Sequence, residues 1–205
     1  MTHILHIDSS PRGDRSISRS LTKTFVDQWQ AAHPDDTVTY RDLGHQPVPH
    51  VDEPWIAASF SPPDQLSPDL KAALQVSDEL IDELFAADLL VFGVPMYNLT
   101  VPSTLKAYID QIVRVGRTFA VNENGYQGLV HGKRMLVFGA RGNEFPPDSP
   151  MAAYDFHTPY IRSIFGFIGI TDIQFVNADG VNTSEETRQK YLQQAHEAIE
   201  QLVAA

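Results

Sequence analysis

The segment of residues 8–18 holds the densest group of hydroxyl and guanidinium side chains in the chain. It reads Asp-Ser-Ser-Pro-Arg-Gly-Asp-Arg-Ser-Ile-Ser and lies between a short apolar run and an amphipathic stretch. A helix N-terminus offers unpaired N–H groups and a partial positive charge, which together bind phosphate. The hydroxyls of Ser10, Ser16 and Ser18, with the backbone at Ile17, would add donors. The segment predicts a phosphomonoester site; the alternative is that Ser16 or Ser18 only caps the helix.

Two common phosphate-binding motifs are missing at this point. No Gly-Lys-Ser or Gly-Lys-Thr follows the first apolar run, and no Gly-x-Gly-x-x-Gly occurs there. These absences argue against a nucleoside triphosphate loop and against a dinucleotide fingerprint.

A second loop, residues 93–103, combines rigidity with a mixture of apolar and polar side chains. Prolines stand near both ends of the loop, and between them lie Met96, Tyr97, Asn98 and Leu99. Such a mixture suits a flat, partly polar heterocycle, because the thioether and the ring supply apolar area while amides meet ring nitrogens and carbonyls. The alternative is a simple tight turn with Tyr97 buried.

A third loop, residues 139–145, contains Ala140, Arg141, Gly142 and Asn143. Glycine permits close backbone approach, and Arg141 would stabilise negative charge that builds up on a reduced ring. The alternative is that Arg141 is a surface charge. Taken together, the three loops predict a site for a ribityl-flavin phosphate.

The elements that must position these loops alternate along the chain. Apolar runs typical of buried strands lie at residues 3–7, 89–94, 134–139 and 173–177, with a weaker one at 37–43. Helical patterns occupy residues 18–31, 67–87, 102–115, 154–168 and 184–203, the last with Ser184 as N-cap. This alternation predicts an α/β protein with three layers, a doubly wound five-stranded parallel sheet. Ligands bind such folds at the carboxyl ends of the strands, so the three loops should share one edge.

The rest of the chain is expected to fold into the same single domain, residues 1–205. The proline-rich stretch 47–68 is interpreted as a surface excursion that folds back, and residues 118–130 as a hairpin-like insert. The stretch 154–168 is apolar around most of its circumference and is expected to be deeply packed. Phe119 either stacks on an aromatic substrate or belongs to the core.

Composition excludes several classes of function. The chain has 205 residues, no cysteine and a net charge of −11 with neutral histidines. Thiolate chemistry is therefore excluded, and nucleic-acid or anionic-membrane binding is not expected because no basic face is available. The eight histidines form no His-Glu-x-x-His pair, so no metal site is predicted, and His157 is the one nearest the expected ligand edge. No stretch is apolar enough to span a membrane, and a cysteine-free chain without an export signal predicts a cytoplasmic protein.

The chain resembles the FMN-dependent NADH-azoreductases, also described as NADH:quinone reductases, of the flavodoxin-like superfamily. The matching residues are Ser9-Ser10 with Ser16-x-Ser18, Pro95-Met96-Tyr97-Asn98, Leu105-Lys106-x-Tyr108-x-Asp110, Thr118-Phe119, Glu123-Asn124-Gly125 with Gly128-Leu129-Val130, Gly132-Lys133, Arg141-Gly142, Thr158-Pro159-Tyr160 and Gly166-Phe167-Ile168-Gly169-Ile170-Thr171-Asp172. They span nearly the whole chain in order and spacing.

This resemblance implies FMN contacts at Ser10, at residues 16–18, at residues 96–99 and at residues 140–143. The family usually has Ser-Arg-Gly-Gly at the last of these, whereas Ala140 and Asn143 replace the outer residues here. It further implies a homodimer with FMN at the interface, NADH as hydride donor, and quinones or aromatic azo compounds as acceptors. Flavin performs the chemistry in such enzymes, so no catalytic side chain is predicted.

Two other functions stay open. A flavodoxin-like electron carrier would exchange electrons with protein partners, and a regulatory module would bind a nucleotide without catalysis. The excursion at 47–68 and the insert at 118–130 favour the enzyme, because they can wall a pocket over the flavin.

Overall fold

The computed structural model describes residues 1–204 and centres on a five-stranded sheet of order β2-β1-β3-β6-β7. All neighbouring strands in it are parallel. The strands are β1 (His3–Asp8), β2 (Thr37–Asp42), β3 (Leu89–Pro95), β6 (Arg134–Ala140) and β7 (Asp172–Ala178). The five predicted strands and the doubly wound arrangement are therefore confirmed.

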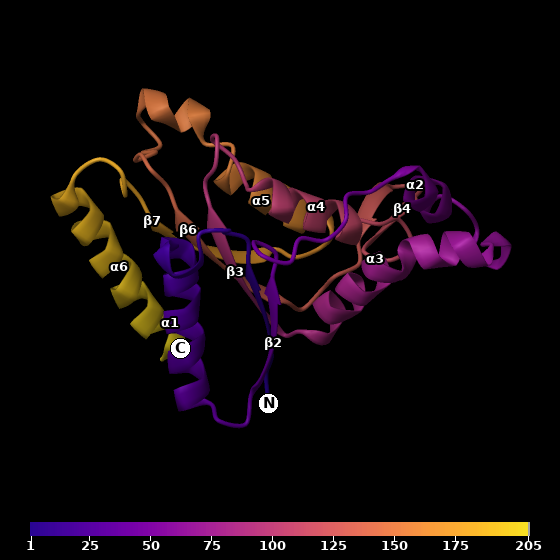
Figure 1. Cartoon of the computed structure of the whole chain (residues 1–205), viewed down its shortest axis with the longest axis horizontal. Helices are drawn as coiled ribbons and strands as arrows, with labels where there is room; N and C mark the ends of the chain where they lie inside the picture. Colours follow the sequence, from indigo (N-terminus) through magenta and orange to yellow (C-terminus); the bar gives the residue numbers. More distant parts are fainter. Residues whose placement is uncertain (205) are drawn as a thin grey trace.

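Helices cover both faces of the sheet, as Figure 1 shows. One face carries α1 (Ile17–Ala32) and α6 (Glu185–Val203), and the other carries α3 (Pro68–Ala86), α4 (Ser103–Ile112) and α5 (Thr158–Phe167). Each helical layer packs on its own hydrophobic core. Ser184 caps α6 by accepting a hydrogen bond from the Thr187 amide, as predicted.

The strands divide their side chains between these two cores with a period of two residues. Leu5 and Ile7 of β1 enter the core beneath α3 and α4, while Ile4 enters the core beneath α1 and α6. Every residue of the central strand β3 is buried. Burial on both faces explains why the strand sequences are nearly continuous apolar runs.

The two predicted additions to the sheet are present. The excursion at 47–68 contains α2 (Glu53–Ser59) and the 3-10 turn η2 (Pro63–Gln65), and it folds back so that the Gln111 side-chain amide donates to the Pro49 carbonyl at 2.9 Å. The insert is an antiparallel hairpin of β4 (Phe119–Asn122) and β5 (Gly125–Gly128). Two further 3-10 turns are η1 (Gly13–Arg15) and η3 (Pro150–Tyr154).

Two helix predictions were wrong in extent. The helix expected at 154–168 begins only at Thr158, because Pro159 has no N–H and fits only the first turn, and Asp155 caps that turn with its carboxylate. It is also not deeply packed around its circumference, since only Ile161 and Phe165 of α5 are fully buried. The helix expected at 102–115 ends at Ile112, and Pro102 stands just before it.

Candidate functional site

The loops after β1, β3 and β6 meet at the carboxyl edge of the sheet, because these three strands are neighbours. They enclose a cavity of ≈ 140 Å³. Its lining residues are Ser10, Arg12, Ser16, Ile17, Pro95, Met96, Tyr97, Ala140, Gly142, Val181 and Asn182. The predicted residues that do not line it are Ser18, Asn98, Leu99, Arg141 and Asn143.

The first loop presents buried hydroxyls at the start of α1. Ser16 is the N-cap, and its hydroxyl oxygen accepts a hydrogen bond from the Arg19 amide. The hydroxyls of Ser16 and Ser18 lie 3.2 Å apart, and Ser18 is fully buried. The Ser10 hydroxyl lies 3.3 Å from the Tyr97 hydroxyl of the second loop. Capping by Ser16 is therefore real, and it leaves the first N–H groups of α1 free for an anion.

Arg19 braces this first loop from outside the cavity, a role that the sequence did not reveal. Its Nε donates to the Ser10 carbonyl at 2.7 Å, and its guanidinium pairs with Asp42 at the end of β2. Burial by itself would lower the pKa of Arg19, but Asp42 and Asp8 raise it above its ordinary value. Gly44, just after β2, packs so closely against the Ser10 backbone that an added Cβ would overlap the Ser10 carbonyl oxygen. The backbone after β2 thus fixes the position of Ser10.

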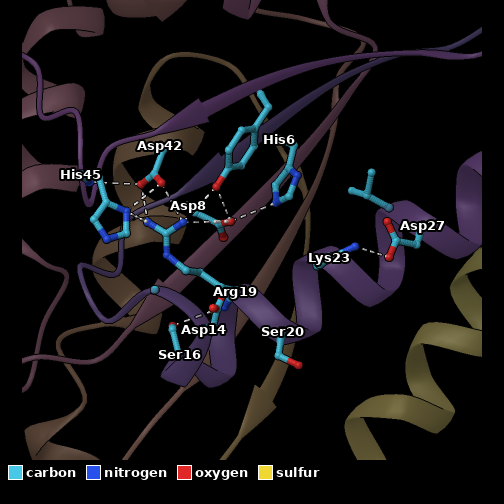
Figure 2. Close-up of a pocket in the computed structure, with 13 residues that line it drawn as sticks. His6, Asp8, Asp14, Ser16, Arg19, Ser20, Lys23, Asp27, Asp42 and His45 are labelled. Atoms are coloured by element: carbon cyan, nitrogen blue, oxygen red, sulfur yellow. Dashed lines mark hydrogen bonds and ion pairs between the residues drawn. The ribbon is translucent and has the colours of Figure 1, made fainter.

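A larger cavity, ≈ 580 Å³, lies between α1 and β2 and not at the junction of the three loops. Figure 2 shows that Asp8, Arg19 and Asp42 point toward one another, whereas Lys23 pairs with Asp27 away from this cluster. Asp8 accepts hydrogen bonds from the hydroxyls of Tyr40 at 3.1 Å and Thr22 at 2.9 Å. Burial and the neighbouring Asp8 raise the pKa of Tyr40 to about 12. Burial would raise the pKa of Asp42, but hydrogen bonds from Arg19 and His45 lower it to about 2. The cluster is internally paired and supports the first loop.

The second loop contains a tight turn with a strained backbone. Asn98 and Leu99 have φ angles of 47° and 73°, in the left-handed region that side chains other than glycine rarely adopt. Hydrogen bonds between the backbones of Tyr97 and Thr100 close the turn. Asn98 is exposed at its tip. Tyr97 is half-buried and lines the cavity, so it is not simply buried in a turn.

In the third loop, the surface alternative for Arg141 is wrong, because this residue is only 6% exposed. Its guanidinium donates to Asp179 at 2.5 Å from both Nε and Nη2, and to Asp155 at 2.8 Å from Nη1. It also lies 5.0 Å from the ring centroid of Phe145. Burial would lower the pKa of Arg141, but the two carboxylates outweigh it and raise the pKa. The group is committed to internal pairing instead of facing the cavity.

His157 and Phe119 have distinct surroundings. The His157 ring is completely buried, and its Nε2 donates to the Val94 carbonyl at 3.0 Å, so it supports β3 and does not line the cavity. Phe119 is half-buried and packs against the rings of Tyr126 and Phe167 at 6.1 and 4.9 Å between centroids. This arrangement makes Phe119 part of an aromatic cluster between the hairpin and α5.

Six residues of the site are absent from the predicted contact set, and two of them, Arg12 and Pro95, lie in the first and second loops and line the cavity. Asp155 and Asp179 pair with Arg141, and Val181 and Asn182 line the cavity. Val181 and Asn182 follow β7, a strand end at the same edge, so strand order was the signal that could have found them. For Asp155 the signal was its place just before Thr158 and Pro159, where a helix cap is expected.

The donor set of the edge fits a phosphorylated heterocycle. Hydroxyls and free helix amides suit a phosphate. Gly142 lets its backbone approach a ligand closely, and a Cβ added there would lie 2.9 Å from the Asn182 side-chain nitrogen. The cavity, at ≈ 140 Å³, is below the roughly 300–1,000 Å³ of a complete ligand pocket. It is therefore too small to enclose such a ligand whole.

Within residues 1–204, no group of His, Asp and Glu side chains is arranged to hold a metal ion. Across the same described residues, none of the helices combines the length and hydropathy needed to cross a membrane.

Strand order and a ligand edge built from hydroxyl-rich and aromatic loops define a flavodoxin-like protein. A family model described as Flavodoxin-like fold matches residues 2–203. The FMN-dependent NADH:quinone oxidoreductase 2 of Trichormus variabilis is 62% identical over 205 residues, covering 100% of this chain and 99% of that protein. The chain belongs to the flavodoxin-like family and, within it, to the family of the FMN-dependent NADH:quinone oxidoreductases.

Solved structures agree with this assignment. An azoreductase from Bacillus anthracis superposes with a TM-score of 0.91 at 29% identity, covering 99% of each chain. An FMN-dependent NADH-azoreductase from the same species, in complex with FMN, superposes with a TM-score of 0.86 at 26% identity, covering 98% of this chain and 99% of that one.

Proposed function

We propose that this chain is an FMN-dependent oxidoreductase that uses NADH to reduce quinones and to cleave aromatic azo compounds. The observation that carries the proposal is the junction of three loops, one rich in hydroxyls and two with aromatic or glycine residues, at one edge of the sheet. The full-length similarity to quinone oxidoreductases and the fold of the azoreductases support it.

The chain's own residues divide the work of holding FMN. Ser10 and Ser16, with the first amides of α1, would bind the phosphate, and the buried Ser18 hydroxyl, 3.2 Å from that of Ser16, would orient the Ser16 hydroxyl toward it. Met96 and Tyr97 would supply apolar area for the ring system, and the backbone at Gly142 would approach it closely. Residues 17, 98, 99, 140, 141 and 143 complete the proposed contact segments.

Bound FMN would supply hydride and electron transfer between NADH and the acceptor, so the chain needs no nucleophile, acid or base of its own. Its contribution is to bind, to orient and to set the electrostatics of the site. Because Arg141 is paired with two carboxylates, we assign it to orientation of the loop and not to charge stabilisation at the ring.

The proposal is tested by titrating the purified chain with FMN. We expect quenching of FMN fluorescence with saturation at one equivalent per chain, bleaching of the flavin absorbance by NADH, and reoxidation by a benzoquinone. A chain that leaves FMN fluorescence unchanged would contradict the function at its first step.

The second candidate, an electron carrier for protein partners, predicts a different outcome of the same experiment. A carrier would be reduced slowly by NADH and would pass single electrons. Stopped-flow absorbance distinguishes the two, because rapid two-electron reduction by NADH and rapid two-electron reoxidation by benzoquinone occur only in the enzyme. The hairpin β4–β5 and the excursion at 47–68 favour the enzyme, since they add walls beyond the sheet edge.

Gly44→Ala should weaken FMN binding, because the new Cβ overlaps the Ser10 carbonyl oxygen and must displace the first loop. If binding FMN then requires about 1–3 kcal/mol more to restore the loop, the dissociation constant rises roughly five- to 140-fold. Gly166→Ala is the matched control, since an added Cβ there meets no atom within 4 Å. Fluorescence quenching titrations measure both, and equal affinities in the two variants would show that Gly44 does not fix the loop.

We also infer that the chain is a single domain that forms a homodimer in the cytoplasm. Both cores pack on one sheet, which supports a single domain. Val121 and Tyr126 of the hairpin are 59% and 71% exposed, and such apolar groups support an interface with a second copy. The lack of cysteine suits a reducing compartment. Light scattering on the FMN complex measures the oligomeric state.

A further inference from the structure

We call residues 155–158 the clasp. They lead from η3 into α5 and include Thr158, the first residue of α5. The clasp contacts both the second loop and the third loop of the proposed flavin site. In Figure 1 the chain descends from η3 into α5 at this point, beside the carboxyl edge of the sheet. None of its four residues lines the cavity itself.

The clasp contacts the third loop through an ion pair, and the carboxylate of that pair also caps the start of α5. Asp155 Oδ2 accepts from Arg141 Nη1 at 2.8 Å. Its other oxygen, Oδ1, accepts from the backbone amides of His157 and Thr158, each at 3.0 Å. Both carboxylate oxygens are therefore used, and Arg141 is joined rigidly to the start of α5. Asp179, which follows β7, fixes the other side of the guanidinium at 2.5 Å.

The contact with the second loop is made at its base and at its turn. His157 donates from Nε2 to the Val94 carbonyl at 3.0 Å, one residue before the loop's first proline. The Phe156 amide donates to the Leu99 carbonyl at 3.1 Å, and the Thr100 hydroxyl donates to the Phe156 carbonyl at 3.4 Å. The clasp thus bonds to the loop on both sides of Met96 and Tyr97.

These bonds act on the strained part of the loop. Asn98 and Leu99 have backbones in the left-handed region, and such a conformation persists only when the surrounding structure holds it. Leu99 is directly bonded to the clasp through its carbonyl. The first loop is braced by Arg19 and Asp42 and meets the second loop where the hydroxyls of Ser10 and Tyr97 lie 3.3 Å apart; none of the clasp's hydrogen bonds described above reaches it.

We propose that the clasp is a positioning element for the flavin ring, fixing the second and third loops relative to each other, while the phosphate is positioned by the first loop, to which the clasp is not bonded. This inference rests on the proposed FMN function. It assigns the clasp residues to orientation, with no contact to the reacting atoms.

Riboflavin, which lacks the phosphate, separates the two halves of the site. Asp155→Ala should weaken FMN and riboflavin binding by the same factor, about tenfold, because the third loop is no longer tied to the clasp through Arg141. Ser18→Ala should weaken FMN binding and leave riboflavin binding unchanged. Because the ring's surroundings move only in the first variant, the midpoint potential of bound FMN should shift in Asp155→Ala and stay at the wild-type value in Ser18→Ala.

Two milder variants keep the test decisive if Asp155→Ala does not fold. Asp155→Asn retains an oxygen for the His157 and Thr158 amides but replaces the acceptor of Arg141 with an N–H, so it should fold and still weaken the binding of both flavins. Thr100→Val removes only the bond to the Phe156 carbonyl, and it should shift the potential in the same direction as Asp155→Ala.

The outcomes separate cleanly. Folded clasp variants with wild-type affinity for both flavins and an unchanged potential would overturn the positioning role, as would a loss confined to FMN. A wild-type chain that binds neither flavin would overturn the proposed function, and the positioning role with it.

Discussion

Arg141→Ala is expected to lower the free energy of unfolding by about 3–5 kcal/mol, the cost of breaking a buried ion pair from one side. The guanidinium is 6% exposed and is the shared partner of Asp155 and Asp179. Removing it leaves two carboxylates with little water and no counter-charge. Urea denaturation followed by circular dichroism measures the loss, and the midpoint should fall while the slope stays constant.

Arg117→Ala is the matched control, because Arg117 also contacts two carboxylates, those of Asp78 and Asp82. Its side chain is 33% exposed, so water screens the pairs and the expected loss is at most about 1 kcal/mol. Equal losses in the two variants would mean that burial does not set the cost, contrary to the assignment of Arg141 as a buried hub.

A double variant separates the lost bonds from the stranded charge. In Arg141→Ala with Asp179→Asn, one of the two uncompensated carboxylates is gone. This variant should be more stable than Arg141→Ala alone, because the remaining amide has a much smaller desolvation penalty than a carboxylate. If adding Asp179→Asn lowers the free energy of unfolding further, the charge of Asp179 is not destabilising when Arg141 is absent.

The sheet could be predicted from sequence because burial on both faces leaves a strong local signal. β3 and β6 are buried runs of apolar residues, and their observed bounds differ from the prediction by one residue at the carboxyl end. The start of α5 could not be found in the same way. Tyr154 and Phe156 extend the apolar pattern of α5 toward the N-terminus, and this pattern outweighed the signal of Asp155 and Pro159, which mark the first turn.

The site shows the same division between local and distant signals. The serines of the first loop are close in sequence, so their types and spacing predicted their gathering at the start of α1. The partners of Arg141 lie 14 and 38 residues away in sequence. An isolated arginine in a glycine-containing loop gives no sign of them, because only the order of β6 and β7 and the connection to α5 bring the carboxylates together.

Acidification should destabilise the chain through His157 well before its carboxylates are protonated. Desolvation lowers the pKa of His157 to about 4, opposed by its bond to the Val94 carbonyl, from an ordinary value of 6.5. The structure gives the reason: Nε2 donates to that carbonyl, whereas Nδ1 is buried and has no hydrogen-bond partner within residues 1–204. Protonation would place a second N–H where nothing described accepts it.

The direction of the effect follows from proton binding in the two states. Between pH 6.5 and about 4 the unfolded chain binds a proton at His157 and the folded chain does not, so stability falls as pH falls through this window. The shift corresponds to a total loss of about 3 kcal/mol. Asp42, whose pKa is lowered to about 2 from 3.8, loses its contribution only below this window.

Urea denaturation at pH 7 and at pH 4.5 measures the loss, and His157→Gln is the variant that should reduce it. A glutamine amide can still donate to the Val94 carbonyl but binds no proton in this range, so most of the acid sensitivity between these two pH values should vanish. His196→Gln, at an exposed position on α6, is the control and should keep the wild-type loss. If His157→Gln loses as much stability on acidification as the wild type does, the sensitivity originates elsewhere, and the buried ring is protonated in the folded chain without cost.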